Sequence, residues 1–194
     1  MEYIESNRGT VGIIEIADYY TQIQQFFVGF YGRPADPAGL NFWAEKVGLA
    51  GGDFSEALNS FANSEEAQDF VFTNPQTGKP YSNAELIDNI YQNLFNRTTD
   101  DAGREYYTGL LKRGEATLGD IVQRVIDGAI NEDRTIFDHK VEVALYFTES
   151  IEQANADYGS EDILEARSIV SDVSLQESSV EEGKDGADDL VKEM

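Results

Sequence analysis

The chain has 194 residues, of which 41% are hydrophobic and 11% aromatic, and this composition can bury a core and excludes wholesale disorder. Its 37 acidic and 14 basic residues give a net charge of −23, which repels nucleic acid and anionic membrane surfaces. The sequence has no run of about eighteen apolar residues for a membrane span, and no cysteine for a disulfide or a thiolate metal site. We therefore expect no nucleic-acid partner and no membrane insertion.

A short arm precedes the first predicted helix. Residues 1–12 hold two glycines among mixed residues, and we interpret them as a flexible arm. From Ile13 to Phe30 apolar residues recur at helical spacing, in a stripe wide enough to predict burial against more than one neighbour. Gly32 is expected to end this helix, because glycine adopts the left-handed conformation at little cost.

A corner motif follows this helix. Asp36 is placed to N-cap a second helix that begins at Pro37. Arg33 stands three residues before Asp36, close enough to tie the corner together by a charge-assisted hydrogen bond. Gly39 and Trp43 complete the motif. The pair is either a structural clip that fixes the angle between two helices or a ligand site, and we favour the clip because the motif is used twice.

The corner motif returns sixty-four residues later, so one helical unit is predicted to occur twice. Arg33 matches Arg97, Asp36 matches Asp100, Gly39 matches Gly103, and the pair Phe42-Trp43 matches Tyr106-Tyr107. Asn96 takes the place of Gly32, and asparagine is the next best residue in the left-handed conformation. The first unit is expected to span residues 13–73 and the second residues 83–130, with three helices in each.

Capping boxes mark three of the remaining helix starts, one of them Ser82 with Glu85 at the start of the second unit. Asp53 with Glu56 is predicted to begin the third helix of the first unit, and Thr117 with Asp120 occupies the same place in the second. Residues 74–82 are punctuated by proline and glycine and are predicted to form a linker loop. The helices of the second unit are expected at Asn83–Phe95, Asp101–Lys112 and Leu118–Ala129.

Residues 131–173 are predicted to form packing helices, of which the longest, Glu132 to Ile151, should lie across both units. It contains His139, the only histidine, which we interpret as a surface or partly buried residue and not as a catalytic group. Residues 174–194 are an acidic tail, either a marginal helix or a linker, because two glycines weaken the helical pattern. The predicted fold class is all-α: two tandem related three-helix units, a long packing helix and an acidic C-terminal tail.

Motifs for catalysis and metal binding are absent from the sequence. It contains no EF-hand loop, no glycine-rich calcium nonapeptide, no P-loop, no His-Glu-x-x-His and no G-x-S-x-G. Paired carboxylates are too numerous to be informative, because a glycosidase needs two at a fixed separation. We therefore predict a noncatalytic protein without cofactors. A calcium role is left open with no site assigned, and we interpret the acidic runs as solvated faces.

A basic and tyrosine-rich patch in the second unit is a candidate glycan-binding site. Tyrosine rings stack on sugars, and nearby Arg or Lys side chains bind hydroxyls and phosphates by charge-assisted hydrogen bonds. The alternative is scattered surface charge on two helices, which we favour over a site. The candidate residues are Arg97, Arg104, Tyr106, Tyr107, Lys112, Arg113 and Arg124.

The corner motif, with an aromatic residue, Gly-Arg, a short spacer, Asp-x-x-Gly and an aromatic pair, resembles a helical repeat catalogued as a domain of unknown function. That repeat is found in N-terminal regions of bacterial surface-layer proteins and RTX-type secreted calcium-binding proteins, and is distantly similar to the phycobilisome linker repeat. The resemblance covers about residues 20–150. The first copy has the family's glycine and tryptophan, Gly32 and Trp43, and the second has Asn96 and Tyr107 instead.

The resemblance implies a function that residue patterns alone do not give. It implies a noncatalytic N-terminal module of an exported surface protein, which anchors that protein to lipopolysaccharide or another envelope polysaccharide and allows self-association in a lattice. It also implies an extracellular, cell-surface location reached by type I secretion, without a cleaved N-terminal signal peptide. The alternatives are a protein–protein assembly module of a secreted protein and a secreted glycan-active enzyme.

Overall fold

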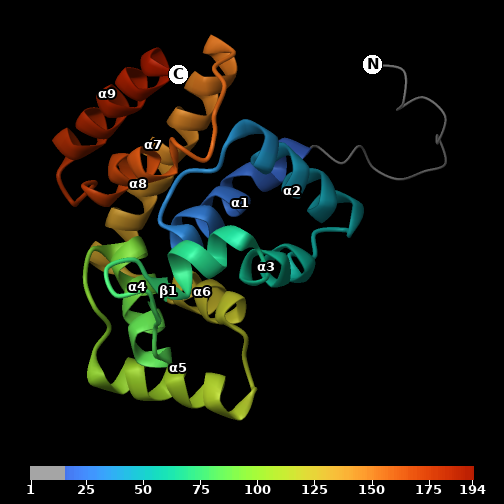
Figure 1. The fold of residues 1–194 in the computed structure, drawn as a ribbon, viewed down its shortest axis with the longest axis vertical. Coiled ribbons are helices and arrows are strands. Elements are labelled where there is room, and N and C mark those ends of the chain that lie inside the picture. The colour runs from blue at the N-terminus through green and yellow to red at the C-terminus, as the bar shows by residue number, and fades with distance from the viewer. Residues whose placement is uncertain (1–15) are drawn as a thin grey trace.

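The computed structural model describes residues 16–194, and of Phe70 it describes the backbone but not the side chain. Helices make up nearly all the regular structure of this part (Figure 1). The first unit contains η1 (Ile16–Tyr19, a 3-10 helix), α1 (Tyr20–Phe26), η2 (Phe27–Tyr31, a π-helix), α2 (Pro37–Leu49), α3 (Ser55–Ala62) and η3 (Ala67–Val71, a π-helix). The second contains α4 (Asn83–Phe95), α5 (Asp101–Arg113) and α6 (Leu118–Asp127). It is followed by α7 (Asn131–Ala154), α8 (Ile163–Ser171) and α9 (Glu177–Glu193). The all-α prediction is confirmed. The predicted arm, residues 1–12, and residues 13–15 lie outside the described part.

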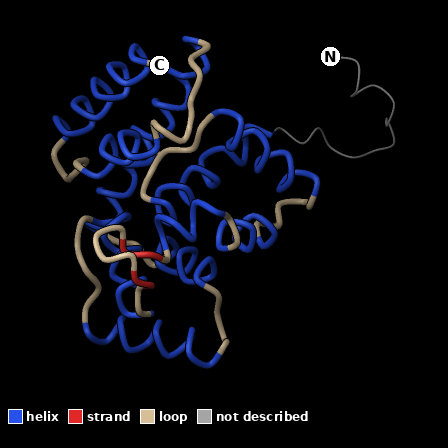
Figure 2. The backbone as a smooth tube through the Cα atoms, in the orientation of Figure 1, coloured by secondary structure: helices blue, strands red, loops and turns tan. Residues whose placement is uncertain are grey.

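The predicted linker loop carries a small hairpin. Strands β1 (Thr73–Asn74) and β2 (Lys79–Pro80) pair antiparallel, and Figure 2 colours them red among the helices. The Asn74 side chain accepts hydrogen bonds from the backbone of the turn, at 2.9 Å from Gln76 N. A ladder of two residues per strand is too short to leave an alternating pattern, and for this reason the sequence indicated a loop without strands.

The repeat predicted from the corner motifs is present in the backbone. Asp36 and Asp100 each accept a hydrogen bond from the N–H three residues on, at 2.8 and 2.7 Å, and so cap α2 and α5. Gly32 and Asn96 both adopt the left-handed conformation, with φ of 68° and 58°. Each corner is therefore fixed by the same local chemistry, and the predicted caps at these two positions are confirmed.

The predicted capping boxes differ between the units. Thr117 and Asp120 form both reciprocal hydrogen bonds at the start of α6. The equivalent box of Asp53 with Glu56 is wrong, because α3 begins at Ser55 and has no side-chain capping bond. Asp53 instead accepts from the Ser55 N–H at 2.9 Å and forms an Asx-type turn.

This difference predicts unequal effects of alanine at equivalent positions. Thr117→Ala is expected to lower the free energy of unfolding by about 1 kcal/mol, because it removes an N-cap. Asp53→Ala is expected to lower the free energy of unfolding by less, because it removes only the hydrogen bond from the Ser55 N–H within the turn. Urea unfolding followed by circular dichroism measures both, and equal losses would contradict the assignment.

The two units share one hydrophobic core, in which equivalent elements meet. The π-helix η2 packs against α4, and α3 packs against α6. Gly29 permits the first approach, since a Cβ there would lie 2.9 Å from Val122 Cγ1 and 3.0 Å from Leu94 Cδ2. Asn93 stands at the position equivalent to Gly29 and donates its side-chain N–H to the Gly29 carbonyl at 3.2 Å. Contact between equivalent positions indicates an approximate two-fold relation between the units.

Helix α7 packs across both units, as predicted. The Thr148 hydroxyl accepts a hydrogen bond from Gln24 of the first unit at 3.0 Å, and Lys140 Nζ donates to the Asn93 carbonyl of the second at 2.7 Å. His139 lies partly buried on α7, with its Nδ1 2.8 Å from the Ser174 carbonyl oxygen. This agrees with a structural role for the histidine.

The acidic C-terminal segment is a packed helix and not a free tail or a linker. Helix α9 runs along α7 and buries Val180, Ala187 and Leu190 (Figure 1). Gly183 lets the helices approach, because a Cβ there would lie 2.9 Å from Val143 Cγ1. The glycine that lowers helix propensity is therefore needed for the packing.

Candidate functional site

The corner arginines form clips, but with partners other than the predicted aspartates. Arg33 is buried and donates from Nε and Nη2 to the two Glu66 carboxylate oxygens at 2.7 and 2.8 Å, whereas Asp36 is 3.9 Å away. Arg97 binds Asp133 in the same bidentate geometry, with Nε and Nη2 donating to the two carboxylate oxygens at 2.9 and 2.6 Å. The predicted Arg33–Asp36 and Arg97–Asp100 bonds are therefore wrong as the principal contacts, because the aspartates serve their helix N-termini.

Each clip also stacks on an aromatic ring at an equivalent position. The Arg33 guanidinium carbon lies 5.1 Å from the centre of the Phe27 ring, and that of Arg97 lies 5.1 Å from the centre of the Tyr91 ring. Burial opposes the charge of Arg33, but the hydrogen bonds and charge of Glu66 outweigh it and raise the pKa of Arg33. Repetition of the ion pair and the ring contact, although Glu66 and Asp133 are not at equivalent positions, favours the structural interpretation of the motif and assigns Arg97 to the corner of the second unit.

Most of the remaining bases in the predicted patch are also paired. Arg104 binds Asp88 at 3.0 Å and Asp101 at 2.9 Å, and Arg113 binds Glu115 at 2.7 Å. The hydrogen bonds that Arg104 donates to Asp88 raise the pKa of Arg104. Within residues 16–194, the only bases of the patch that form no ion pair are Lys112 and Arg124.

The two tyrosines of the patch differ in exposure. Tyr106 is 55% exposed, whereas Tyr107 is partly buried and in edge contact with Tyr106 at 5.1 Å between ring centres. Burial, together with the neighbouring Tyr91 hydroxyl, raises the pKa of Tyr107 to about 12, and the charge of Arg124 opposes this shift. The seven predicted residues therefore surround α5 on several sides and do not converge on one cavity.

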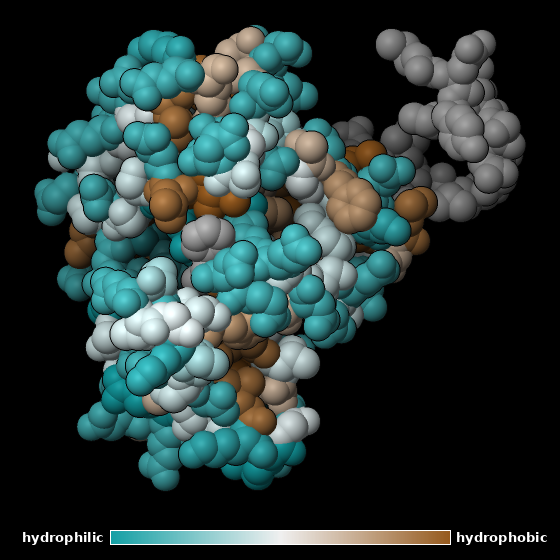
Figure 3. Space-filling model, in the orientation of Figure 1, coloured by the Kyte–Doolittle hydropathy of each residue, from teal (hydrophilic) through white to brown (hydrophobic). Residues whose placement is uncertain are grey.

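Two of them, Arg104 and Lys112, line an open hollow of about 390 Å³ between α5 and the start of α4. Its walls mix cations, carboxylates, hydroxyls and an amide, which together can donate and accept hydrogen bonds with a polar ligand. The other lining residues are Ser82, Asn83, Ala84, Asp101, Glu105 and Thr108. Figure 1 places α5 at the lower edge of the molecule, where Figure 3 shows mostly hydrophilic surface.

The first unit has no hollow at the equivalent place, because side chains fill the seam between α2 and α1. Leu40, Ala44 and Gly48 are buried on α2, and Arg104, Thr108 and Lys112 hold the same positions on α5. Tyr20, whose hydroxyl donates to Asn41, is replaced by Ala84. The seam is closed because α2 packs against η1, α1, α3 and α7, whereas α5 buries only Leu110 among its own residues.

Arg104 replaces a contact that α7 makes in the first unit. There, Thr148 of α7 bonds Gln24 at 3.0 Å and the corner backbone at 2.6 Å. In the second unit the position of Gln24 is Asp88, and Arg104 of α5 itself bonds Asp88 at 3.0 Å and the corner backbone at 3.1 Å. Arg104 thus satisfies Asp88 and the Thr99 carbonyl oxygen, while the outer face of α5 is left uncovered. Sequence reasoning missed this face, although comparison of positions 40, 44 and 48 with 104, 108 and 112 contains the signal.

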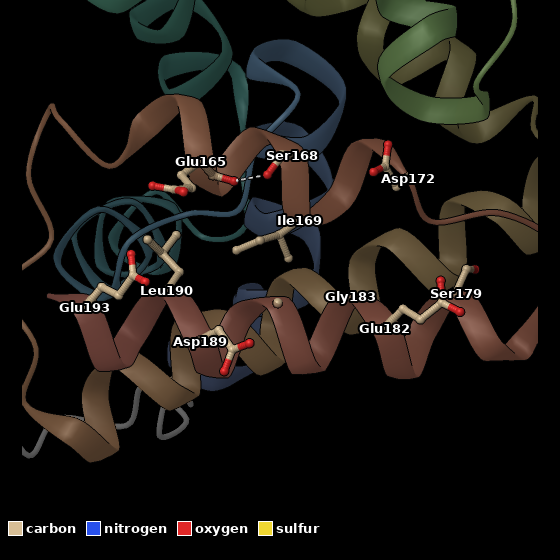
Figure 4. Close-up of a pocket in the computed structure, with 11 residues that line it drawn as sticks. Glu165, Ser168, Ile169, Asp172, Ser179, Glu182, Gly183, Asp189, Leu190 and Glu193 are labelled. Atoms are coloured by element: carbon tan, nitrogen blue, oxygen red, sulfur yellow. Dashed lines mark hydrogen bonds between the residues drawn. The ribbon is translucent and has the colours of Figure 1, made fainter.

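An acidic groove of about 340 Å³ lies between α8 and α9. Figure 4 shows its carboxylates spread along the groove, from Glu165 and Glu193 at one end to Asp172 and Glu182 at the other. Residues 16–194 contain no group of three or more His, Asp or Glu side chains arranged to hold a metal ion. The calcium role left open by the sequence stays a prediction without a site.

Comparison with known proteins matches residues 72–132 to the family model described as Domain of unknown function (DUF4214). The match covers the hairpin and the second unit, so it falls on the copy with Asn96 and Tyr107 and not on the copy with the glycine and tryptophan. No curated protein and no solved structure matches the chain. None of the helices in residues 16–194 combines the length and the apolar character that a bilayer span requires.

Proposed function

We propose that this chain is a noncatalytic binding module of an exported bacterial surface protein, and that it attaches that protein to lipopolysaccharide or another envelope glycan. The uncovered face of α5 is the binding surface. The observation that carries the proposal is the hollow, because the equivalent seam of the first unit is filled by apolar and tyrosine side chains. The link to surface-layer proteins comes from the resemblance of the corner motif.

The chemistry of the hollow suits an anionic sugar. Lys112 supplies a cation that no carboxylate of the described residues neutralises, and Thr108 and Asn83 supply neutral hydrogen-bonding groups. Asp101 and Glu105 can accept bonds from sugar hydroxyls. Because the chain carries a net charge of −23, an anionic glycan must meet a local cation or bridging divalent ions.

Co-sedimentation with bacterial envelopes tests the proposal. The full chain is mixed with envelopes that carry intact lipopolysaccharide or lack its O-polysaccharide, each with calcium and with a chelator. Binding to the intact envelopes alone is expected, and calcium dependence would indicate bridging of carboxylates. Binding to neither, together with concentration-dependent oligomers, would overturn the proposal in favour of an assembly module.

A charge reversal in the hollow provides the residue-level prediction. Lys112→Glu is expected to weaken envelope binding about tenfold, because it replaces a charge-assisted hydrogen bond with repulsion. Lys79→Glu, an exposed substitution on β2, makes the same change of charge outside the hollow and is expected to have little effect. Equal losses in both variants would show that only net charge matters, and would contradict a site at α5.

A further inference from the structure

Tyr20 shows what kind of group fills the seam between the first two helices of a unit. It is the first residue of α1, it packs on the core, and its hydroxyl donates to the side-chain oxygen of Asn41 on α2. Asn41 is held in place by a hydrogen bond from its Nδ2 to the Pro37 carbonyl oxygen at 2.8 Å. The seam of the first unit therefore contains a six-membered ring whose hydroxyl donor is directed at Asn41.

The second unit lacks this ring but keeps its space and its acceptor. Ala84 stands at the position of Tyr20 and Glu105 at the position of Asn41, and both line the hollow. A carboxylate accepts a hydrogen bond as the Asn41 oxygen does, and it also attracts a cation. Within residues 16–194, no side chain forms an ion pair with the Glu105 carboxylate. The hollow can therefore take an external ring with a donor that reaches Glu105.

The wall on α5 indicates which kind of ring fits. Three buried positions of α2 in the first unit become Arg104, Thr108 and Lys112 on α5 in the second. A phenol ring against these side chains would take water from them and offer a hydrogen bond only at its hydroxyl. A pyranose ring offers hydroxyls around its whole edge. The substitutions therefore favour a sugar over a tyrosine side chain of a partner protein.

We propose that the hollow binds the pyranose ring of an amino sugar, with its ammonium group on Glu105 and an anionic group of the same ring on Lys112. The inference rests on the proposed glycan-binding function and names the class of sugar. Glu105 and Lys112 lie on one face of α5, about 10 Å apart along the helix axis. Both side chains are long enough to reach the two ends of a single sugar between them. Ala84 leaves the room that the ring needs.

An amino sugar also reduces the conflict of charge between the protein and its ligand. The chain carries a net charge of −23, which repels a glycan that is only anionic. An ammonium group on the sugar lowers the negative charge of the glycan, and Glu105 attracts it. Lys112 then neutralises the remaining anionic group, and no bridging divalent ion is required. The inference therefore expects binding in the presence of a chelator.

A titration of the full chain followed by NMR tests the assignment with two sugars, glucosamine 6-phosphate and N-acetylglucosamine 6-phosphate. The buffer is mildly acidic, so that the amine is protonated. Glucosamine 6-phosphate is expected to bind about fivefold more tightly. Glu105→Gln, which leaves a neutral acceptor like that of Asn41, should remove this preference. Glu152→Gln, an exposed substitution on α7, removes the same charge elsewhere and should retain it.

A second variant closes the hollow. Ala84→Tyr repeats the arrangement of Tyr20 in the first unit, so its ring is expected to fill the hollow and to abolish the binding of both sugars. Circular dichroism should show that the chain remains folded, because the first unit accommodates the same side chain at this position. Gln92→Tyr adds an exposed tyrosine on the same helix outside the hollow and should bind both sugars as the wild type does.

Envelope binding separates the inference from the proposed function. Glucosamine 6-phosphate should displace the chain from intact envelopes, also in the presence of a chelator. Equal binding of the two sugars, or a preference that survives Glu105→Gln, would overturn the amino-sugar assignment, and envelope binding that depends on Lys112 would then leave the glycan function intact. If the wild type binds no envelope, the proposed function is overturned. Binding of glucosamine 6-phosphate that Ala84→Tyr abolishes would in that case support the same site with a free sugar phosphate as its ligand.

Discussion

Replacing Arg33 by alanine is expected to lower the free energy of unfolding by about 3–4 kcal/mol, whereas the same change at Arg97 should cost about 1 kcal/mol or less. The two residues make the same contacts in different surroundings. The Arg33 side chain is 6% exposed and its partner Glu66 17%, so truncation leaves a carboxylate with little water and without the guanidinium that binds both its oxygens. The Arg97 side chain is 46% exposed, so water solvates Asp133 when the arginine is removed.

Urea unfolding of the two variants measures this difference, and each variant is the control of the other. Arg33→Lys should recover only part of the loss, because an ammonium cannot bind both Glu66 oxygens in the planar geometry of the guanidinium. Equal costs at the two corners would contradict the role of burial. If Arg33→Ala leaves the free energy of unfolding unchanged, Glu66 must find another partner.

The parts of the fold that depend on local chemistry were predictable from the sequence. The left-handed corners need Gly32 or Asn96, and the helix starts after them need Asp36 or Asp100, so these residues identified both corners and the repeat. Such signals act within a few residues, and a single sequence contains them in full. The missing cap at Asp53 is the exception, because Phe54 there packs against Tyr19 and Phe26 and helix α3 starts two residues after Asp53.

The parts that depend on distant partners were not predictable. Glu66 stands thirty-three residues after Arg33, and only the folded chain brings it closer than Asp36. Likewise Gly183 weakens a helix in isolation but permits the close approach of α9 to α7. In the candidate site, the sequence identified Arg104 and Lys112 as residues of interest, but their shared hollow depends on which face of α5 is left uncovered.

Lys140 combines burial with positive charge, and this predicts an unusual pH dependence of stability. Its side chain is 1% exposed on α7, and its Nζ donates to the Asn93 carbonyl in the last turn of α4 at 2.7 Å. A cation at a helix C-terminus satisfies a carbonyl oxygen that has no partner within the helix. Burial nevertheless lowers the pKa of Lys140 to about 8, and the charge of Asp172 offsets only part of this shift.

The free energy of unfolding of the wild type should therefore rise with pH relative to Lys140→Met, by about 3 kcal/mol between pH 7 and 10.5. In the unfolded chain the lysine has its ordinary pKa of 10.5, so between about pH 8 and 10.5 the unfolded state binds more protons than the folded state. The burial penalty is then relieved as the pH increases, and it is fully present below about pH 8. Urea unfolding of the wild type and of Lys140→Met at several pH values measures this difference in the free energy of unfolding. Tyrosines that titrate in both proteins contribute equally to both, so their contributions cancel. A wild-type advantage that is flat or falls with pH would contradict the buried charge.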